Sequence, residues 1–350
     1  MSKILFFSDI HFHHTHRFSV ITQEGYTVRE QEHLSCADDI IKLLESEKFN
    51  KVVFGGDLYG PVGDAISCQT QCAVIDFVVQ IAATCKQQGV VFEMLVGNHD
   101  LSKNTIHLNI NKLTPFAFYD NVRIHCVPTC EGKYVYMPYC TNDEQAITFL
   151  SNIENKEDKI VFAHLDLAGI NLGNGIFTTK GVPLDLLRQF KMVFEGHYHS
   201  GGNYGRNIIV SGSTQRLSFK DKGIARNNII IYDSETDKVR RESFHCPDWL
   251  TFTDDNIEDI LKISNDNYVK VELSTDILMT PEIKEKLDHV KGKDIHIDIN
   301  RITVNKQVNE ELTTENEQDI LTNFVNKSEN TEEQKEALIQ EGIRLLKAVQ

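Results

Sequence analysis

The sequence predicts an α/β fold, and two patterns support that prediction. Short apolar runs rich in β-branched and aromatic residues recur along the chain, and each ends in a polar or glycine-containing turn. Between several of these runs lie longer segments in which apolar residues recur at spacings of three and four, as on one face of a helix. Strands that alternate with helices in this way are typical of α/β proteins.

The predicted strands are continuously apolar rather than alternating between apolar and polar residues, which indicates strands that are covered on both faces. In chain order they are residues 4–7, 52–54, 90–96, 122–127, 134–137, 160–163, 192–194, 208–210 and 229–232. The two clearest helices between them are residues 30–48 and 65–88. The alternation of strand and helix extends at least to residue 200.

The character of the chain changes after Asp233. A loop at His245 to Asp248 precedes a small β-α-β unit, predicted as a strand at 268–273, a helix at 281–290 and a strand at 295–299. A polar stretch that begins at Thr303 then leads to two amphipathic segments, 314–325 and 331–349. We therefore predict a main domain over residues 1–245, a small α/β capping domain over 246–302, and a linker with a C-terminal helical pair over 303–350.

Composition limits the function classes. The 350 residues are 25% charged and 41% hydrophobic, and no apolar run approaches the roughly 20 residues that a membrane span needs. The N-terminal apolar run reaches Asp9 too soon for a signal peptide, so we expect a soluble, cytoplasmic protein without a membrane partner. A net charge of −15 argues against indiscriminate adhesion to nucleic acid, although a local basic groove remains compatible with it. The eight cysteines are scattered, and we expect reduced, mostly buried thiols.

Polar side chains with metal-binding chemistry follow several of the predicted strands. In open α/β sheets, ligands bind at the carboxyl ends of the strands. A single histidine after a strand is more often structural than a ligand, but the recurrence at successive strand ends favours a metal site. The candidate ligands are Asp9, His11, Asp57, Asn98, His164, His197 and His199, and His99 stands beside Asn98.

The mixture of ligand types narrows the metal and the reaction. Carboxylates and imidazoles without a thiolate suit Mn, Fe or Zn better than Ca or Mg. Asp57 is the natural bridge, because one carboxylate oxygen can lie between two cations and offset their repulsion. Two metals roughly 3.5–4 Å apart can hold a hydroxide and a phosphate for in-line displacement. The pattern therefore indicates phosphoester hydrolysis.

The series D-x-H, G-D, G-N-H-D, H and G-H-x-H, over residues 9–199, resembles the calcineurin-like metallophosphoesterase superfamily. The resemblance implies a β-sandwich flanked by helices and two divalent ions, for which we expect Mn²⁺. Carried over by position, Asp9, His11, Asp57 and His199 would bind one ion, and Asp57, Asn98, His164 and His197 the other. His99 would be the acid that protonates the leaving oxygen or steadies the transition state.

Two features depart from or extend the shared motifs. Many relatives carry His or Asp three residues after the bridging aspartate, whereas this chain has Gly60 there. His13, His14 and His16 match no ligand position; they are solvent-facing loop residues or they grip substrate phosphate, and their turn is a candidate to replace the side chain that Gly60 lacks.

The substrate class depends on residues outside the metal motifs. The segment from Ser211 to Phe219 resembles the one that follows G-H-x-H in SbcD and its relatives, which are nuclease subunits of double-strand-break repair. Length and element order resemble a compact phage recombination endonuclease subunit. This implies DNA as substrate, an SMC-like ATPase partner docked on the C-terminal helices, and a homodimer. Arg216 is either a strand-end residue in an ion pair or a DNA phosphate contact.

Three functions are compatible with these observations. The first is a metal-dependent exonuclease or endonuclease subunit that works with an ATPase in DNA repair, recombination or replication. The second is a stand-alone phosphodiesterase or phosphatase on a small molecule, and the third is a non-catalytic interaction module. The tail favours the first, because a solitary small-molecule enzyme has no need of two amphipathic helices beyond a polar linker.

Overall fold

A computed structural model describes residues 2–13, 18, 20–60, 66–102, 110–171, 176–216, 218–219, 228–274 and 278–297, together with 322, 325–326, 331 and 334–341. Contacts divide the chain into two compact units, residues 1–297 and 298–350, and each is described by itself. The predicted domain limits at 245/246 and 302/303 stay predictions.

The first sheet of the larger unit has six strands. β1 (Lys3–Phe7), β2 (Lys51–Phe54), β3 (Phe92–Leu95) and β4 (Val122–His125) are parallel neighbours, and β13 (Ile229–Asp233) pairs antiparallel with β1. β14 (Lys238–Glu242) forms the edge. This strand is missing from the sequence prediction because its residues are mostly charged, which is how sheets protect an exposed edge.

A second six-stranded sheet faces the first. Its order is β11 (Gly202–Asn203), β12 (Ile208–Val210), β10 (Met192–Glu195), β7 (Ile160–Ala163), β6 (Tyr134–Met137) and β5 (Thr129–Glu131). Apolar side chains of both sheets share one core; for example, the rings of Phe6 and Phe162 lie 6.1 Å apart. The predicted α/β class and the sandwich implied by the resemblance are both confirmed.

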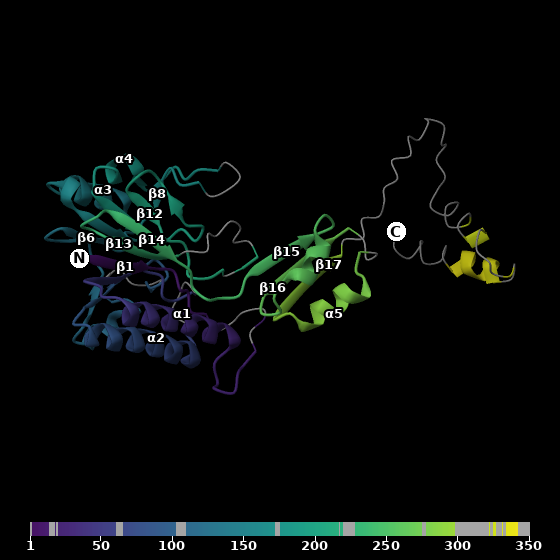
Figure 1. Cartoon of the computed structure of the whole chain (residues 1–350). Coiled ribbons are helices and arrows are strands. Elements are labelled where there is room, and N and C mark those ends of the chain that lie inside the picture. Colours follow the sequence, from purple (N-terminus) through teal and green to yellow (C-terminus); the bar gives the residue numbers. More distant parts are fainter. Residues whose placement is uncertain are drawn as a thin grey trace, which may run out of the picture. The chain divides into compact units, whose positions relative to one another are not determined.

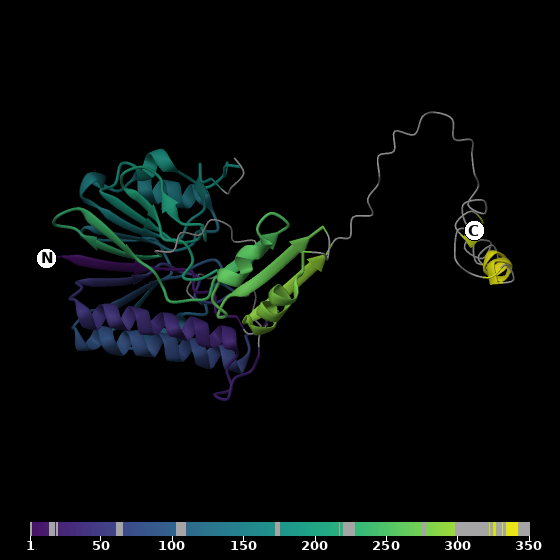
Figure 2. The same ribbon diagram turned by 45° about the vertical axis from the view of Figure 1, so that its right-hand side comes forward.

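Helices cover the outer faces of this sandwich. α1 (Val28–Ser46) and α2 (Cys68–Gln87) lie side by side along the sheet that holds β1 (Figures 1 and 2). Leu5 and Phe7 of β1 join the core under these helices, whereas Ile4 and Phe6 join the core between the sheets. Each strand is therefore buried on both faces, as its continuous apolarity predicts. On the other side, α3 (Asp143–Ser151) and α4 (Leu184–Leu187) pack on the second sheet.

Two local features of the helices are informative. Thr27 caps α1, and Glu30 reciprocates by accepting a hydrogen bond from the Thr27 amide, which completes a capping box. By length and composition α2 could cross a membrane, but one of its faces is buried in the core under the first sheet, as expected of a core helix.

The cysteines differ from the expectation in one respect. All eight are free, and the structure describes all of them, but only Cys36 and Cys85 are buried. Cys68 and Cys72 lie on the exposed side of α2, and Cys130 lies on β5 at a sheet edge. The prediction of mostly buried thiols is therefore wrong, because scattered spacing says nothing about which face of an element a residue occupies.

Residues after His245 form a separate three-stranded sheet with its own core. β15 (Trp249–Thr253), β16 (Tyr268–Leu273) and β17 (Gly292–Ile297) are all parallel, and η3 (Ile257–Lys262) and α5 (Pro281–His289) connect them. The sequence prediction missed β15. The last strand of the unit, β17, begins at Gly292 and not at residue 295 as predicted. The remaining short elements are η1 (Thr114–Phe118), η2 (Lys156–Asp158), β8 (Leu167–Ala168) and β9 (Val182–Pro183).

An aromatic and ionic cluster joins this small sheet to α1. The Arg29 guanidinium, 1% exposed, lies 5.3 Å from the Trp249 ring and 5.6 Å from the Tyr268 ring. The Tyr268 hydroxyl donates to Glu32 of α1 over 2.8 Å. Phe18, at the end of the histidine-rich turn, lies with its ring 5.9 Å from Trp249 and 5.5 Å from Tyr268. Phe18 is therefore anchored on the small sheet.

Most of the predicted C-terminal helical pair lies outside the described residues. Residues 325–326 and 334–341 are helical. In this unit Val325 is buried, whereas Leu338 is 49% exposed.

A buried charged residue between the two large sheets gives a prediction about stability. Glu93 of β3 is 2% exposed, accepts from Lys51 over 2.9 Å and pairs with His125 Nε2 over 2.7 Å. Burial raises the pKa of Glu93, but the His125 hydrogen bond and the Lys51 charge outweigh burial and lower that pKa from 4.5 to about 2.

We expect Glu93→Gln to lower the free energy of unfolding at neutral pH by roughly 3–5 kcal/mol, because it leaves the Lys51 ammonium, whose side chain is 13% exposed, without its counter-charge. Since the folded pKa is depressed, the stabilisation by Glu93 is complete above pH 4.5 and disappears as the pH falls towards about 2. Denaturant unfolding across that range should show a smaller acid loss in the variant. Glu131→Gln, at a half-exposed carboxylate paired with Arg123, is the matched control and should change stability by less than about 1 kcal/mol. Equal stability of both variants would contradict this account.

Candidate metal centre

The candidate ligands gather where the carboxyl ends of strands from both large sheets meet. Asp9 and His11 follow β1, Asp57 follows β2, and Asn98 and His99 follow β3. His164 follows β7, and His197 and His199 follow β10 in the second sheet. The two sheets therefore each contribute ligands to one site, as the recurrence of polar residues after the strands predicts.

The backbone at this site is unusual. Four of these residues have backbone φ angles in the left-handed region, which residues other than glycine seldom adopt. The angles are 57° for Asp9, 55° for His11, 59° for Asp57 and 56° for His197. Hydrogen bonds between neighbouring strand ends hold two of these turns: the Asp9 amide donates to Gly56 O over 3.0 Å, and the His11 amide donates to Asp57 O over 3.1 Å. Strained backbone of this kind is concentrated at functional sites.

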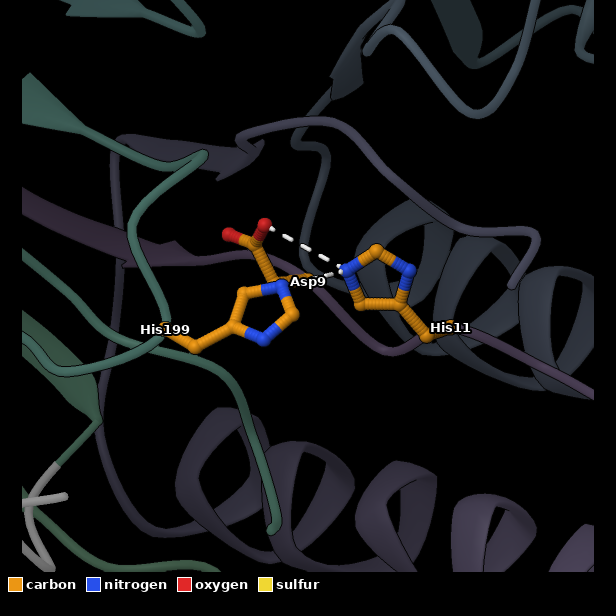
Figure 3. A group of neighbouring side chains, drawn as sticks. All are labelled: Asp9, His11 and His199. Carbon is orange, nitrogen blue, oxygen red and sulfur yellow. Dashed lines mark hydrogen bonds and ion pairs between the residues drawn. The ribbon is translucent and has the colours of Figure 1, made fainter. Parts of the chain in front are cut away.

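Asp9, His11 and His199 form one group of convergent side chains (Figure 3). His11 Nε2 lies 3.6 Å from Asp9 Oδ1 and 3.0 Å from His199 Nε2, so both partners face the same ring nitrogen (Figure 3). Asp9 and His11 are buried and His199 is half-buried. The ligand atoms of the three residues all lie within 4.8 Å of one another.

Asp57, His164 and His197 form a second group, whose ligand atoms also all lie within 4.8 Å of one another. Asn98 belongs to it, because its Oδ1 lies 3.1 Å from His164 Nε2 and 3.1 Å from His197 Nδ1. This amide oxygen is therefore directed at the same point as the two imidazoles.

Asp57 connects the two groups through a single atom. Its Oδ2 lies 3.6 Å from His11 Nε2 in the first group and 3.3 Å from His164 Nε2 in the second. Its Oδ1 accepts a hydrogen bond from the His99 amide over 2.8 Å, which fixes the orientation of the carboxylate. Gly97 makes room for it, since a Cβ at position 97 would lie 2.2 Å from Asp57 Oδ1. This is the arrangement that a bridging carboxylate requires.

The donor set and its electrostatics fit divalent cations. Buried Asp9 Oδ1 has no hydrogen-bond partner among the described residues, and two imidazole nitrogens face each other at 3.0 Å. Burial lowers the pKa of His164, but the charges of Asp57 and Asp9 outweigh burial and raise that pKa to about 10. Burial likewise opposes ionisation of Asp57, but His164 and His11 outweigh it and hold the Asp57 pKa well below its ordinary range. The carboxylates therefore attract positive charge to this point.

The candidate acid His99 lies beside both groups. Its ligand atom belongs to a third cluster with His11 and Asp57, and its ring packs edge-on to His11 with centroids 4.8 Å apart. Its Nδ1 donates to the Gly60 carbonyl, which leaves Nε2 as the ring nitrogen available to the site. Burial lowers the pKa of His99 despite the opposing charge of Asp57.

Comparison with protein families identifies this site. The family model of the calcineurin-like phosphoesterases matches residues 2–269, which include both ligand groups. The chain belongs to the calcineurin-like phosphoesterase family. The chain is also similar to a curated protein named exonuclease subunit 1 of enterobacteria phage T4, with 24% identity over 325 residues, which cover 87% of this chain and 89% of that protein. The predicted enzyme class, a phosphodiester hydrolase, is confirmed by these two comparisons.

Several residues that support the phosphoesterase site are absent from the sequence prediction. Asp100 accepts from the amides of Asp57 and Gly97 at 3.0 and 2.9 Å, and so shapes the turn that carries the bridge. Asp166 Oδ1 lies 3.0 Å from His197 Nε2, which orients that imidazole. Asp100 is the last residue of the motif G-N-H-D and Asp166 lies two residues after His164, but only contacts across loops reveal their roles.

Two further supports come from the strand ends themselves. The hydroxyl of Ser8 donates to Asp9 Oδ2 and lies 2.6 Å from Ser211 Oγ. Glu195, at the end of β10, is buried, and its Oε1 accepts from the Leu165 amide over 2.7 Å, which fixes the chain next to His164. Burial raises the pKa of Glu195 to about 8. An apolar run that ends in one Ser or Glu gives no signal for such roles.

The structure also places the residues whose roles stay open in this phosphoesterase. A Cβ at Gly60 would lie 2.9 Å from His11 O and 3.2 Å from the Cβ of His13, so His13 occupies the space next to the missing side chain. His14 and His16 lie outside the described residues. Arg216 Nη1 donates to the Trp249 carbonyl over 2.7 Å, which places its guanidinium at the junction with the small sheet.

Proposed function

We propose that this phosphoesterase is a metal-dependent DNA nuclease subunit that works with an SMC-like ATPase in DNA repair, recombination or replication. The observation that carries the hydrolytic part is the shared position of Asp57 Oδ2, 3.6 Å from one imidazole and 3.3 Å from the other. One ion would be held by Asp9, His11, Asp57 and His199, and the other by Asp57, Asn98, His164 and His197. Mn²⁺ suits these nitrogen and oxygen donors.

When bound, such a pair of ions supplies positive charge for the phosphate and lowers the pKa of water. The chain's own groups supply the rest. The Gly60 carbonyl fixes the His99 ring, so that Nε2 can deliver a proton to the leaving oxygen. Asp166 and Asp100 hold His197 and the Asp57 turn in place.

The choice of DNA as substrate rests on similarity. The phage T4 relative is named as an exonuclease subunit, and the match extends over most of both chains. We extend that activity to this chain because the match continues beyond the metal motifs, which end at residue 199, through the small sheet.

The test compares two substrates with the purified full-length protein and added Mn²⁺. We expect degradation of linear duplex DNA and of bis(p-nitrophenyl) phosphate, both lost after chelation and restored by Mn²⁺. Hydrolysis of the small ester without any cleavage of single- or double-stranded DNA would favour a stand-alone phosphodiesterase instead. Sedimentation of the same sample would test the proposed homodimer.

The proposed ATPase contact involves the C-terminal unit. Isolated helices of this length are marginal in water, so their apolar side chains require a partner surface. Leu338, 49% exposed on the 334–341 helix, is such a side chain. We propose that the apolar stripes of the C-terminal helices dock on the coiled-coil base of the ATPase, in the manner of a helix in a groove.

Deletion of residues 313–350 should abolish co-purification with the ATPase and ATP-stimulated cleavage of duplex DNA. Mn²⁺-dependent hydrolysis of bis(p-nitrophenyl) phosphate should stay within about twofold of the intact protein, because every candidate ligand lies in the larger unit. Leu338→Asp should reproduce the loss of binding, and Glu336→Gln on the same helix is its control. A deletion variant that still binds the ATPase with unaltered affinity would refute the contact.

A further inference from the structure

A cavity of about 730 Å³ lies beside the metal centre. The loop that follows β6, the first turn of α3, and residues 178–180 before β9 line it. No candidate ligand lines it, so it is a space distinct from the ion positions themselves. Its volume is within the range of sites that hold small organic ligands.

The cavity nevertheless shares a wall with the centre. Asp166 lines the cavity and contacts His197 over 3.0 Å. Tyr139 also lines it, and the ring of Tyr139 lies 6.0 Å from the ring of His197 and 6.5 Å from that of His164. The Tyr139 amide donates to Val96 O over 2.8 Å, which ties this loop to the turn that carries Asn98. The cavity therefore lies directly next to the centre, on the side of Asp166 and Tyr139.

The charges of the lining select what can enter. Carboxylates of Asp143, Glu144 and Asp166 line the cavity, against a single cation, Lys180. A second phosphate in this space would meet repulsion at close range. An uncharged group with hydrogen-bonding edges would instead find hydroxyl, amide and carboxylate partners, including those of Thr141 and Thr179.

We propose that this cavity binds the nucleoside attached to the scissile phosphate, with Tyr139 as an aromatic contact for the base. The inference rests on the proposed nuclease function and adds a substrate feature to it. Because the lining disfavours a further phosphate, the nucleoside that enters is one at the end of a strand. The cavity thus favours removal of terminal nucleotides over internal cleavage.

The first test compares two chromogenic esters with the full-length protein and Mn²⁺: thymidine 5′-p-nitrophenyl phosphate and bis(p-nitrophenyl) phosphate. We expect the lower KM for the nucleoside ester. Tyr139→Ala should raise the KM of the nucleoside ester relative to that of the other ester by roughly 5- to 100-fold, the range of base-stacking contacts. Thr179→Trp, which fills the cavity, should shift the same ratio in the same direction.

The matched control fills a different space. Glu154 lines a second cavity, of about 450 Å³, near α3, and Glu154→Trp should leave both KM values within about twofold of the unmodified protein. Equal KM values for the two esters in the unmodified protein, or equal effects of Thr179→Trp and Glu154→Trp, would overturn the proposal.

The second test addresses the charge argument. A 3′-phosphate on the nucleoside ester should raise its KM, and the double variant Asp143→Asn, Glu144→Gln should reduce that penalty at least about threefold, because it removes two of the repelling carboxylates. An unchanged penalty would contradict the selection by charge.

The outcomes separate this inference from the proposed function. Cleavage of DNA together with equal use of both esters would overturn the cavity assignment and leave the nuclease proposal intact. Hydrolysis of the esters without cleavage of any DNA would overturn the nuclease proposal and, with it, the assignment of the cavity to the end of a strand.

Discussion

Replacement of Asp57 by alanine is expected to abolish binding of both ions and to lower the rate of phosphodiester hydrolysis by more than about 10³-fold. The reason is the shared oxygen: Asp57 Oδ2 faces both ligand groups, at 3.6 Å and 3.3 Å from their imidazoles. Without it each group loses a ligand, and two neighbouring cations would repel each other without an intervening negative charge. Metal analysis after gel filtration and hydrolysis of bis(p-nitrophenyl) phosphate measure the two effects.

The matched control for Asp57→Ala is Asp120→Ala, which removes an exposed carboxylate that pairs with Lys86 at the surface. It should retain both ions and full activity. An Asp57→Ala protein with two tightly bound ions and unchanged activity would show that the binuclear arrangement is wrong. Circular dichroism of the Asp57→Ala and Asp120→Ala proteins checks that both variants are folded.

His99→Ser is expected to lower the rate of hydrolysis by about 10²- to 10⁴-fold while metal content stays near that of the unmodified protein. His99 Nδ1 is already engaged by the Gly60 carbonyl, and the role assigned to Nε2 is proton delivery to the leaving oxygen. A substrate whose leaving group has a low pKa needs no such proton and should therefore partly rescue the variant. His289→Ser, at an exposed histidine of α5, is the control.

Metal content is the decisive measurement for His99, because its side chain could also bind an ion. The ligand atoms of His99, His11 and Asp57 all lie within 4.8 Å of one another. Parallel loss of metal and activity in His99→Ser would make His99 a ligand rather than an acid. Loss of activity without rescue by the better leaving group, at full metal content, would point instead to a role in positioning phosphate.

The parts of the fold that could be predicted from sequence are those that are buried on two sides. β1, β2 and β7 are continuously apolar because helices cover one face and the other sheet covers the second, and their bounds are nearly those predicted. β8 and β9 have two residues each, too few for any pattern. β15, with the sequence WLTFT, mixes polar and apolar residues because its sheet is small and only partly covered.

The candidate site, like the fold, has a part that could be predicted from sequence and a part that could not. Residue types and their place after strands were sufficient to name the candidate ligands and to expect them together. What sequence could not show are interactions made by the backbone or across loops. The partner that orients His99 is the carbonyl of Gly60, an atom that every residue possesses. The contact between Asp166 and His197 joins positions 31 residues apart.

The left-handed backbone at Asp9, His11, Asp57 and His197 also bears on how this sequence can change over time. Each such conformation costs of order 1–3 kcal/mol for a residue with a side chain, and glycine adopts it without that cost. Glycine at any of these positions would relieve strain but remove a candidate ligand. Stability and ion binding are therefore opposed at these four positions. A glycine variant at any one of them is expected to unfold at a higher denaturant concentration than the unmodified protein and to bind less metal.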